Sequence, residues 1–477
     1  MRKISVKTKV AHGVGAMALS AKDAAFINFV PFFYTQVAGL SGTLYGWAAF
    51  IGQLSDAITD PIFGTLSDNA RSRWGRRHPF MIASIIPLVI CFILLFNPPK
   101  GWHGIALFLW LAGVAIALRT SLTVFVIPHM AFGAELSEDY EERSLIVSYR
   151  TLLAWIGGVA LPALALVFIF SRTADGADGR LVASNYNFYA WASAVVVIIV
   201  ILWTVFFTRK EIPHLPPPGA QRKLKLLDPV RDVISALENR NFRRLFIVFL
   251  FIGATTGVIV TLGYYANTYF WEFSAPQVGL ILSSSVIGVG IGFAILRPVA
   301  ARFEKKHIFI GAMVVLVVNG IWWYGARLID ILPPNGAPIL FYLAILHQII
   351  LSGAVMMQQT ISGSMVADIV DEHEVETGGR RDGVFFAALG FSAKIPTGLG
   401  QLVGGTLIDV MGIETGLEPG EVPEDVLWNL GLVTGPLVSL SLLLPIWLLI
   451  AYNLDRRRHA ELRAMLGRSD LPAQPSA

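Results

Sequence analysis

The chain has 477 residues, of which 55% are hydrophobic and only 15% are charged. A water-soluble domain usually carries about a quarter charged residues, so this composition excludes an ordinary soluble protein and predicts that much of the apolar surface faces a lipid bilayer. The formal net charge is +4, but the basic residues recur in short clusters between apolar runs, and we therefore expect no nucleic-acid partner.

Apolar runs follow one another along the whole chain, and each is long enough for a membrane-spanning helix, which needs roughly 20 residues. They lie at 10–38, 43–67, 79–98, 104–134, 145–171, 187–208, 244–270, 276–299, 306–328, 336–367, 383–411 and 428–454. We therefore predict an all-α membrane protein with twelve transmembrane helices.

Lysine and arginine concentrate in alternate loops, for example at 71–77, 209–243 and 456–458. By the positive-inside rule, this pattern predicts a multi-pass protein of the cell inner membrane with both termini in the cytoplasm. The hydrophilic stretch 209–243 contains Pro216–Gly219 and follows the sixth run. It predicts an N-terminal six-helix half (1–208), a linker (209–243), a C-terminal six-helix half (244–455) and a cytoplasmic tail (456–477).

Ionisable side chains occur inside several of the predicted spans. Each costs at least ~2.5–3.5 kcal/mol in a bilayer, so such residues face a polar cavity and mark function. They are Lys22 and Asp23, Asp56 and Asp60, Arg119, Arg150 and Lys394.

Asp56 and Asp60 are four residues apart and so lie on one face of their helix. Two neighbouring carboxylates repel each other in a low dielectric unless one is protonated or a cation lies between them. Thr59 could add a hydroxyl oxygen, so we predict a site for a monovalent cation. The alternative is that the two acids pair with Arg150 or Lys394 and only hold helices together.

Arg119 has no acid one turn away on its own helix, so its partner comes from another helix or from the substrate, and Asp23 is the simplest acidic candidate. Pro128 and Pro396 fit ordinary helix bending as well as gating. His373–Thr377 lacks the second histidine of the HExxH zinc motif, and we expect it to be a solvated loop. No enzyme motif is present, so we predict a transporter without an organic cofactor.

Two adjoining segments carry a family resemblance. Ser55–Gly64 and the loop Arg71–Arg77 resemble the second helix and following loop of the glycoside–pentoside–hexuronide:cation symporter family, part of the major facilitator superfamily. Tyr34-Thr35, Ile127-Pro128 and Gly379–Arg381 extend the resemblance along the chain. It implies a major facilitator fold.

The resemblance also implies roles for individual residues. Asp56 and Asp60 match the carboxylates that couple transport to Na⁺ or H⁺. Thr59 replaces an asparagine of the family, and Thr123 matches a hydroxyl ligand on the fourth helix. We therefore expect Asp56, Asp60, Thr59 and Thr123 to bind the coupling cation, which is Na⁺ at the two acids if the protein is sodium-coupled.

The sugar site of the family is only partly retained. Arg150 and Lys394 match basic residues that line it, whereas Gln359 replaces a tryptophan and Val126 replaces an aspartate. Ser20 aligns with a family acid, and Lys22-Asp23 lies one turn further along. The expected substrate-binding residues are Ser20, Lys22, Asp23, Arg119, Arg150, Gln359 and Lys394.

Four basic residues in the spans face three acids, and a bound cation would add one more positive charge. A net positive cavity of low dielectric favours an anionic solute. We therefore expect a monomeric symporter that couples a monovalent cation to a sugar or glycoside, preferably an anionic, uronide-like one. The alternatives are a lysolipid or other amphiphile symporter on the same scaffold and a membrane sensor, against which the coupling acids argue.

Overall fold

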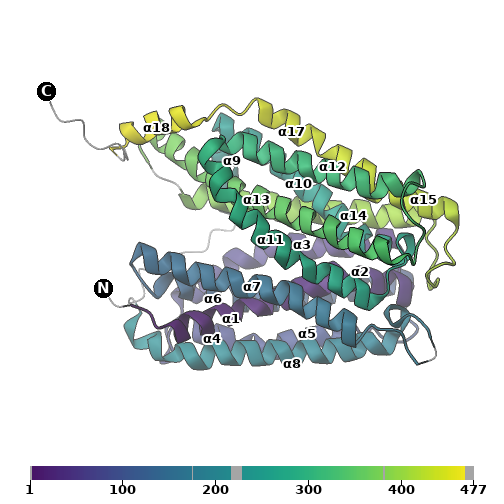
Figure 1. Ribbon diagram of the computed structural model, residues 1–477. Coiled ribbons are helices and arrows are strands. Elements are labelled where there is room, and N and C mark those ends of the chain that lie inside the picture. The colour runs from purple at the N-terminus through teal and green to yellow at the C-terminus, as the bar shows by residue number, and fades with distance from the viewer. Residues whose placement is uncertain (1–2, 175, 216–227, 380–381, 468–477) are drawn as a thin grey trace. The chain divides into compact units, whose positions relative to one another are not determined.

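The computed structural model describes residues 3–174, 176–215, 228–379 and 382–467 (Figure 1). The helices in the first part of the chain are α1 (Val6–Ala24), α2 (Val30–Phe32), α3 (Gly42–Asn69), α4 (His78–Ala83), α5 (Ile85–Leu95), α6 (Gly104–Glu135), α7 (Tyr140–Phe168) and α8 (Ala183–Thr208). The remaining helices are α9 (Asp228–Ala236), α10 (Arg240–Tyr265), α11 (Ala275–Arg302), α12 (Lys305–Leu328), α13 (Pro338–Thr377), α14 (Asp382–Met411), α15 (Glu424–Leu432), α16 (Val438–Ser441), α17 (Leu443–Ile450) and α18 (Arg456–Met465).

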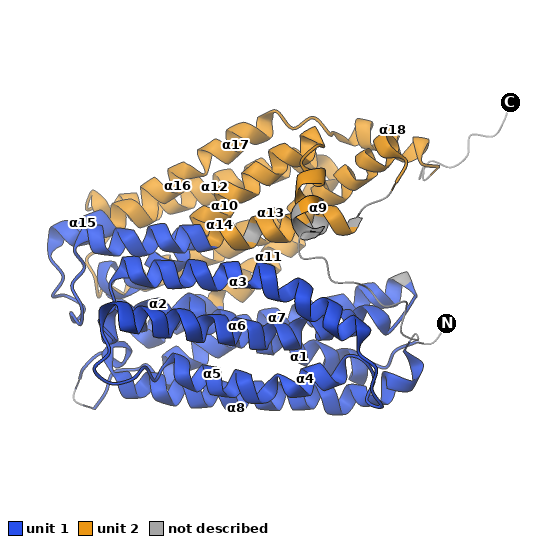
Figure 2. Ribbon diagram, turned by 180° about the vertical axis from the view of Figure 1, so that it is seen from behind, with its two compact units in different colours: residues 1–226, 257–283, 398–430 blue, residues 227–256, 284–397, 431–477 orange. Residues whose placement is uncertain are grey.

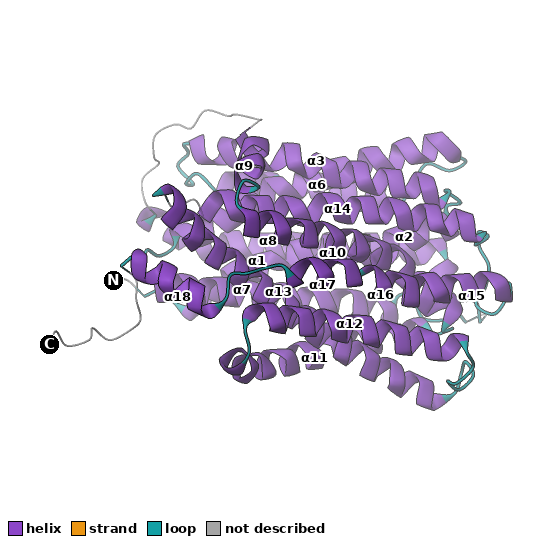
Figure 3. Cartoon of the chain, turned by 90° about the horizontal axis from the view of Figure 1, so that it is seen from above, coloured by secondary structure: helices purple, strands orange, loops and turns teal. Residues whose placement is uncertain are grey.

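All regular structure in the described residues is helical (Figure 3). Nine helical segments there are long and apolar enough to cross a membrane. Three further helical segments, α1 with its continuation to Val37, α3 and α14, fall outside this set. They are the ones that carry Lys22 and Asp23, Asp56 and Asp60, and Lys394, and these charges lower their mean hydropathy. Together the segments account for the twelve predicted spans.

The tenth span is longer than its apolar run, because α13 continues to Thr377. The expectation of a solvated loop at His373–Thr377 was therefore wrong. Glu372 accepts hydrogen bonds from the side-chain amides of Asn241, at 2.9 Å, and Asn239, at 3.3 Å, so its carboxylate is compensated while buried. The helix ends where Gly378 adopts a φ of 74°, which glycine takes without strain.

The described helices group into two compact units (Figure 2). Unit 1 comprises residues 1–226, 257–283 and 398–430, and unit 2 comprises 227–256, 284–397 and 431–477. Helices α10, α11, α14 and α15 each contribute residues to both units, so the units do not coincide with the predicted six-helix halves. The halves and the linker remain predictions.

Within unit 1, α1 packs against α7 and α8, and α3 packs against α6. In unit 2, α12 packs against α13 and α17, and α18 packs against α13. The core of unit 2 includes Phe242, Phe309, Met365 and Phe385, all fully buried. Because both faces of such helices meet other helices or lipid, they need little amphipathic patterning.

One end of unit 1 joins the first helices of the chain to residues 257–283 and 398–430, and we call it the tied end. The Asp409 carboxylate accepts hydrogen bonds from the backbone N–H groups of Gly42, at 2.7 Å, and Thr43, at 2.8 Å. These are unsatisfied donors at the start of α3, where a negative charge is favourable. A Cβ on Gly405 would lie 2.1 Å from the Gly42 carbonyl oxygen. The backbones of α3 and α14 are therefore in direct contact at these two glycines.

Candidate functional site

The candidate site lies where α3 packs on α6 in unit 1. Ser41 begins α3 by accepting a hydrogen bond from the Leu44 N–H at 3.3 Å. The Arg119 guanidinium lies 2.9 Å from the Asp56 carboxylate, and the Thr123 hydroxyl donates to Asp60 at 2.8 Å. Both pairs are 63 residues apart, so the helices run parallel with matching turns.

Arg119 is held tightly at this site, with only 5% of its surface exposed. Its Nη1 also donates to the Gln53 side-chain oxygen at 2.7 Å, and its guanidinium carbon lies 5.1 Å from the centre of the Phe26 ring. Its Nε is buried without a hydrogen-bond partner. The guanidinium therefore has a donor to spare for a further acceptor.

The observed ion pairs differ from those weighed from the sequence. Asp56 pairs with Arg119, a partner that was not among those weighed for it from the sequence. Asp23 pairs with its neighbour Lys22, not with Arg119. The turn-by-turn match of α3 and α6 decides the first pairing, because it places Arg119 opposite Asp56 across a helix contact.

Asp60 and Thr123 bring side-chain oxygens of α3 and α6 into contact, and Asp56 lies one turn before Asp60 on α3. Thr59 lies one turn after Asp56, and its hydroxyl is buried without a hydrogen-bond partner. Carboxylate and hydroxyl oxygens are ligands that hard cations accept. The oxygens of Asp56, Asp60, Thr59 and Thr123 are therefore chemically suited to a small monovalent cation.

The remaining unit 1 residues predicted to bind substrate lie on α1 and α7. The Ser20 hydroxyl donates to the Ala154 carbonyl at 2.8 Å, so it already joins α1 to α7. Lys22 is buried, and Arg150 is half-buried on α7.

The two other predicted residues, Gln359 on α13 and Lys394 on α14, are exposed and belong to unit 2. The structure thus brings Asp56, Asp60, Thr123 and Arg119 together within unit 1.

Two contact residues of Arg119, Gln53 and Phe26, were missed from the sequence. Gln53 lies one turn before Asp56 on the same helix face, which is the signal that could have identified it. Phe26 lies in a π-helical turn, Ala25–Phe29, and a hydrophobic run gives no sign of such a turn.

The basic loop after α3 forms a second charged cluster in unit 1. Arg77 contacts Glu135 at 2.6 Å and Asp68 at 2.6 Å, and Arg76 contacts Glu135 at 2.9 Å. Arg77 also donates to Ser67 at 2.7 Å. The cluster fixes the ends of α3 and α6, which carry the candidate site further along their length.

The family of MFS/sugar transport proteins has a sequence profile that matches residues 11–456. The chain belongs to this family. The match confirms the resemblance found in the sequence and makes the protein a transporter of the major facilitator type.

Three relatives can be aligned with this chain over most of its length and over most of their own. A putative glycoside/cation symporter, YagG, of Escherichia coli is 26% identical over 86% of this chain and 84% of its own. A glucuronide carrier protein homolog of Escherichia coli is 23% identical, covering 85% and 83%. A sodium-dependent lysophosphatidylcholine symporter of Danio rerio is 23% identical, covering 87% and 80%.

A solved structure confirms the fold. The nucleoside transporter NupG superposes with a TM-score of 0.63 at 14% identity, covering 94% of this chain and 99% of that one. At this identity the likeness concerns the fold alone. The family match and this superposition together support a multi-pass membrane transporter with the twelve-helix major facilitator fold.

Proposed function

We propose that this transporter couples the entry of a monovalent cation, Na⁺ or H⁺, to the uptake of an anionic sugar-like solute. The observations that carry the proposal are the contact of Arg119 with Asp56 and, one turn further along the same two helices, the contact of Thr123 with Asp60. Thr59, next to Asp60 in the sequence, has a buried hydroxyl without a hydrogen-bond partner. The Arg119 guanidinium thus already contacts Asp56, one of the two carboxylates proposed to bind the cation.

Arg119 and the cation compete for Asp56 in the proposed mechanism. The Arg119–Asp56 pair compensates the buried carboxylate while no ion is bound, because an unpaired charge there is costly. A cation that binds among the four oxygens weakens the hold of Asp56 on Arg119. The guanidinium then has Nη1 as well as its spare Nε available for a substrate anion. Cation binding thereby raises the affinity for the solute, which is the condition for symport.

The charge balance of unit 1 favours an anionic solute. Among the residues of unit 1 predicted to bind the cation or the substrate, three are basic, Lys22, Arg119 and Arg150, and three are acidic, Asp23, Asp56 and Asp60. One added cation makes this set net positive, and an anion then restores neutrality in a low dielectric. The name of the Escherichia coli glucuronide carrier homolog agrees with this substrate class.

The deciding experiment is competitive uptake of a matched glucoside and glucuronide into vesicles, by wild type and by Arg119→Gln. We expect wild type to prefer the glucuronide. In Arg119→Gln, glucuronide uptake should fall about tenfold or more, equivalent to ~1.4 kcal/mol, while glucoside uptake changes far less. Equal use of both solutes by wild type would disprove the anionic preference. The same assay with imposed Na⁺ or proton gradients identifies the coupling ion.

The second candidate function is symport of a lysolipid, which the name of the Danio rerio relative suggests. Lysophosphatidylcholine carries a phosphate that Arg119 could bind in the same way as a carboxylate. Adding lysophosphatidylcholine as a competitor in the uptake assay separates the two functions. If it inhibits more strongly than the glucuronide and is itself accumulated, the amphiphile is the substrate.

A further inference from the structure

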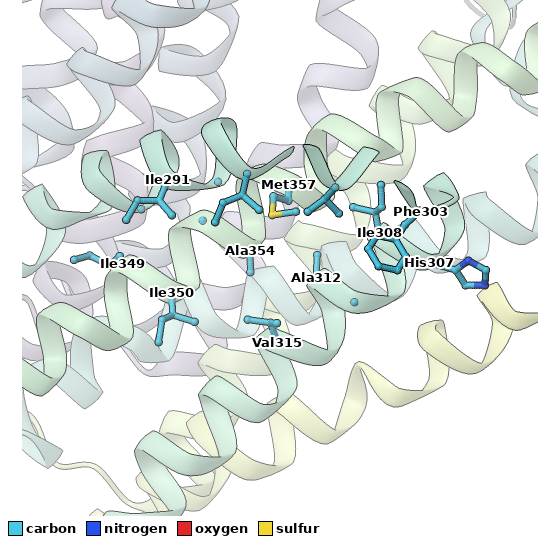
Figure 4. Close-up of a pocket in the computed structure, with 16 residues that line it drawn as sticks. Ile291, Phe303, His307, Ile308, Ala312, Val315, Ile349, Ile350, Ala354 and Met357 are labelled. Atoms are coloured by element: carbon cyan, nitrogen blue, oxygen red, sulfur yellow. The ribbon is translucent and has the colours of Figure 1, made fainter. Parts of the chain in front are cut away.

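An apolar groove of about 520 Å³ lies between α11, α12 and α13, and all the residues that line it belong to unit 2. In Figure 4 the labelled side chains extend from Ile291 and Ile349 at one end to Phe303 and His307 at the other. The lining is almost entirely aliphatic. Ile291, Ile295 and Val315 nevertheless remain 42–45% exposed, so the groove is open to the surroundings of the helices.

Small residues create this groove. A Cβ on Gly288 would lie 2.2 Å from the Ile349 carbonyl oxygen, so α11 and α13 are in backbone contact at its floor. On α12, Gly311 and Ala312 line the groove with little or no side chain. A Cβ on Gly311 would meet no atom within 4 Å, so the groove is open at that point.

The position of the groove defines its surroundings. Its three helices are membrane spans, and along α11 the lining extends from Gly288 to Val299, which is about 16 Å at 1.5 Å per residue. One leaflet of the hydrocarbon core is about 15 Å thick, half of about 30 Å. An open apolar groove of this length at this depth meets lipid chains.

One end of the groove is basic. His307 lines it and is exposed. Arg302 is also exposed and follows Ile295 by seven residues, or two helical turns, so it continues the groove face of α11. The neighbouring lysines already have partners within unit 2. Lys305 pairs with Asp368 at 2.6 Å, and Lys306 donates a hydrogen bond to the Tyr452 carbonyl at 2.9 Å.

We propose that this groove binds one acyl chain of an anionic phospholipid whose phosphate lies at Arg302 and His307. Guanidinium groups bind phosphate oxygens through charge-assisted hydrogen bonds, and an imidazole offers a donor in either protonation state. The acyl chain covers the exposed isoleucine and valine side chains along the groove. This lipid site is separate from the transport residues of unit 1 and does not depend on the proposed function.

The test uses the whole protein in phosphatidylcholine vesicles that contain phosphatidylglycerol with a photoreactive group in one acyl chain. We expect the cross-linked peptides to come from α11, α12 and α13. Gly311→Phe places a ring in the open part of the groove and should lower this labelling about tenfold, or ~1.4 kcal/mol. Gly290→Phe is the matched control, because Gly290 is exposed on α11, does not line the groove and would have no atom within 4 Å of an added Cβ.

The headgroup contact is tested by competition. Unlabelled phosphatidylglycerol should compete better than phosphatidylcholine or palmitate in wild type, and Arg302→Gln should remove this preference. Arg297→Gln is its control, because Arg297 is exposed on the same helix and lies about 140° around it from Arg302. Labelling that Gly311→Phe leaves unchanged would overturn the site. Equal competition by palmitate in wild type would overturn the assignment of a phospholipid.

Discussion

Asp56 is buried on a membrane helix, yet it is not an isolated charge, because Arg119 lies 2.9 Å away. Removing one partner of a buried ion pair typically costs about 3–5 kcal/mol, since the other charge is left uncompensated. A pair of this kind therefore stabilises the resting protein. A cation that competes for the Asp56 carboxylate would weaken this pair and so change the state of Arg119.

Replacing Asp60 by asparagine tests the coupling role. Asp60→Asn keeps the shape and can still bond Thr123, but it removes a charge that holds the cation. We expect cation-driven accumulation to be abolished while solute exchange survives, as measured by uptake and counterflow in vesicles. Asp56→Asn should behave in the same way. If both variants still concentrate solute against a gradient, these acids only pack helices.

Replacing Arg119 tests its competition with the cation. Arg119→Gln leaves Asp56 without its guanidinium, so the apparent melting temperature in detergent should fall in the absence of the coupling ion. Adding that ion should then stabilise Arg119→Gln more than wild type, because the ion takes over the role of the arginine. The double variant Arg119→Gln/Asp56→Asn is the control and should lose the extra response. An equal response of wild type and Arg119→Gln would contradict the competition.

At the scale of helices, the tied end shows how the start of α3 and the residues just before it are held. Tyr269 donates to the Gln36 side-chain oxygen at 3.0 Å, and the Gly416 N–H approaches the same atom at 3.2 Å. The Asp409 contacts with the start of α3 add a charged hydrogen bond. A transporter that alternates between two open states has to separate such contacts in one of them.

Enlarging Gly405 should keep the tied end from closing. Gly405→Leu puts a side chain where even a Cβ would lie 2.1 Å from the Gly42 carbonyl oxygen, so α3 and α14 must move apart. We expect solute uptake to be lost while the protein still reaches the membrane. A cysteine at Thr43 should gain reactivity with a membrane-impermeant thiol reagent in the Gly405→Leu background. Unchanged uptake and reactivity would show that the contact is not required.

The loop before α8 contains a buried ion pair outside the spans. Arg180 contacts Asp178 at 2.6 Å and donates to Thr268 at 2.8 Å. Burial alone would raise the pKa of Asp178, but the hydrogen bonds and charge of Arg180 outweigh it and hold the pKa below the ordinary value of 3.8. The ionised carboxylate is therefore favoured by folding.

This pair predicts an acid dependence of stability. Because the folded-state pKa of Asp178 is lowered, its contribution is complete above pH 3.8 and is lost as the pH falls through the folded-state value. Asp178→Asn should lower the melting temperature at neutral pH and flatten its decline in acid. Melting curves of wild type and variant across this range check the prediction. Parallel curves would contradict it.

At the scale of the whole molecule, the basic clusters between the spans predict that both termini, the linker 209–243 and the segment Asp371–Arg381 face the cytoplasm. A cysteine at Gly219, which lies outside the described residues, in a Cys91→Ser background should therefore resist impermeant thiol reagents in intact cells and react after permeabilisation. A cysteine at Gly176 in the opposite loop is the positive control. Labelling of the Gly219 variant in intact cells would show that the linker faces outward and would contradict the predicted topology.

The sequence alone determined the class of protein, the twelve spans and the family. A bilayer imposes a minimum length on every apolar run, and this requirement can be read without knowing which helices touch. The spacing of Asp56 and Asp60 likewise follows from helical periodicity, so their shared face was predictable. The continuation of α13 through 368–377 was not predictable, because a run of charged residues is typical of a loop. The hydrogen bonds that Asn239 and Asn241 donate to the buried Glu372 are visible only in the structure.

Only the tertiary structure decided which charges pair. From the sequence, Arg119 could have met Asp23 or a substrate, and Asp56 could have met Arg150 or Lys394. The choice depends on the register and rotation of α3 against α6, which side-chain packing sets over the full length of both helices. The apolar groove in unit 2 arises in the same way, because Gly311 leaves space only when α11 and α13 meet at Gly288 and hold α12 beside it.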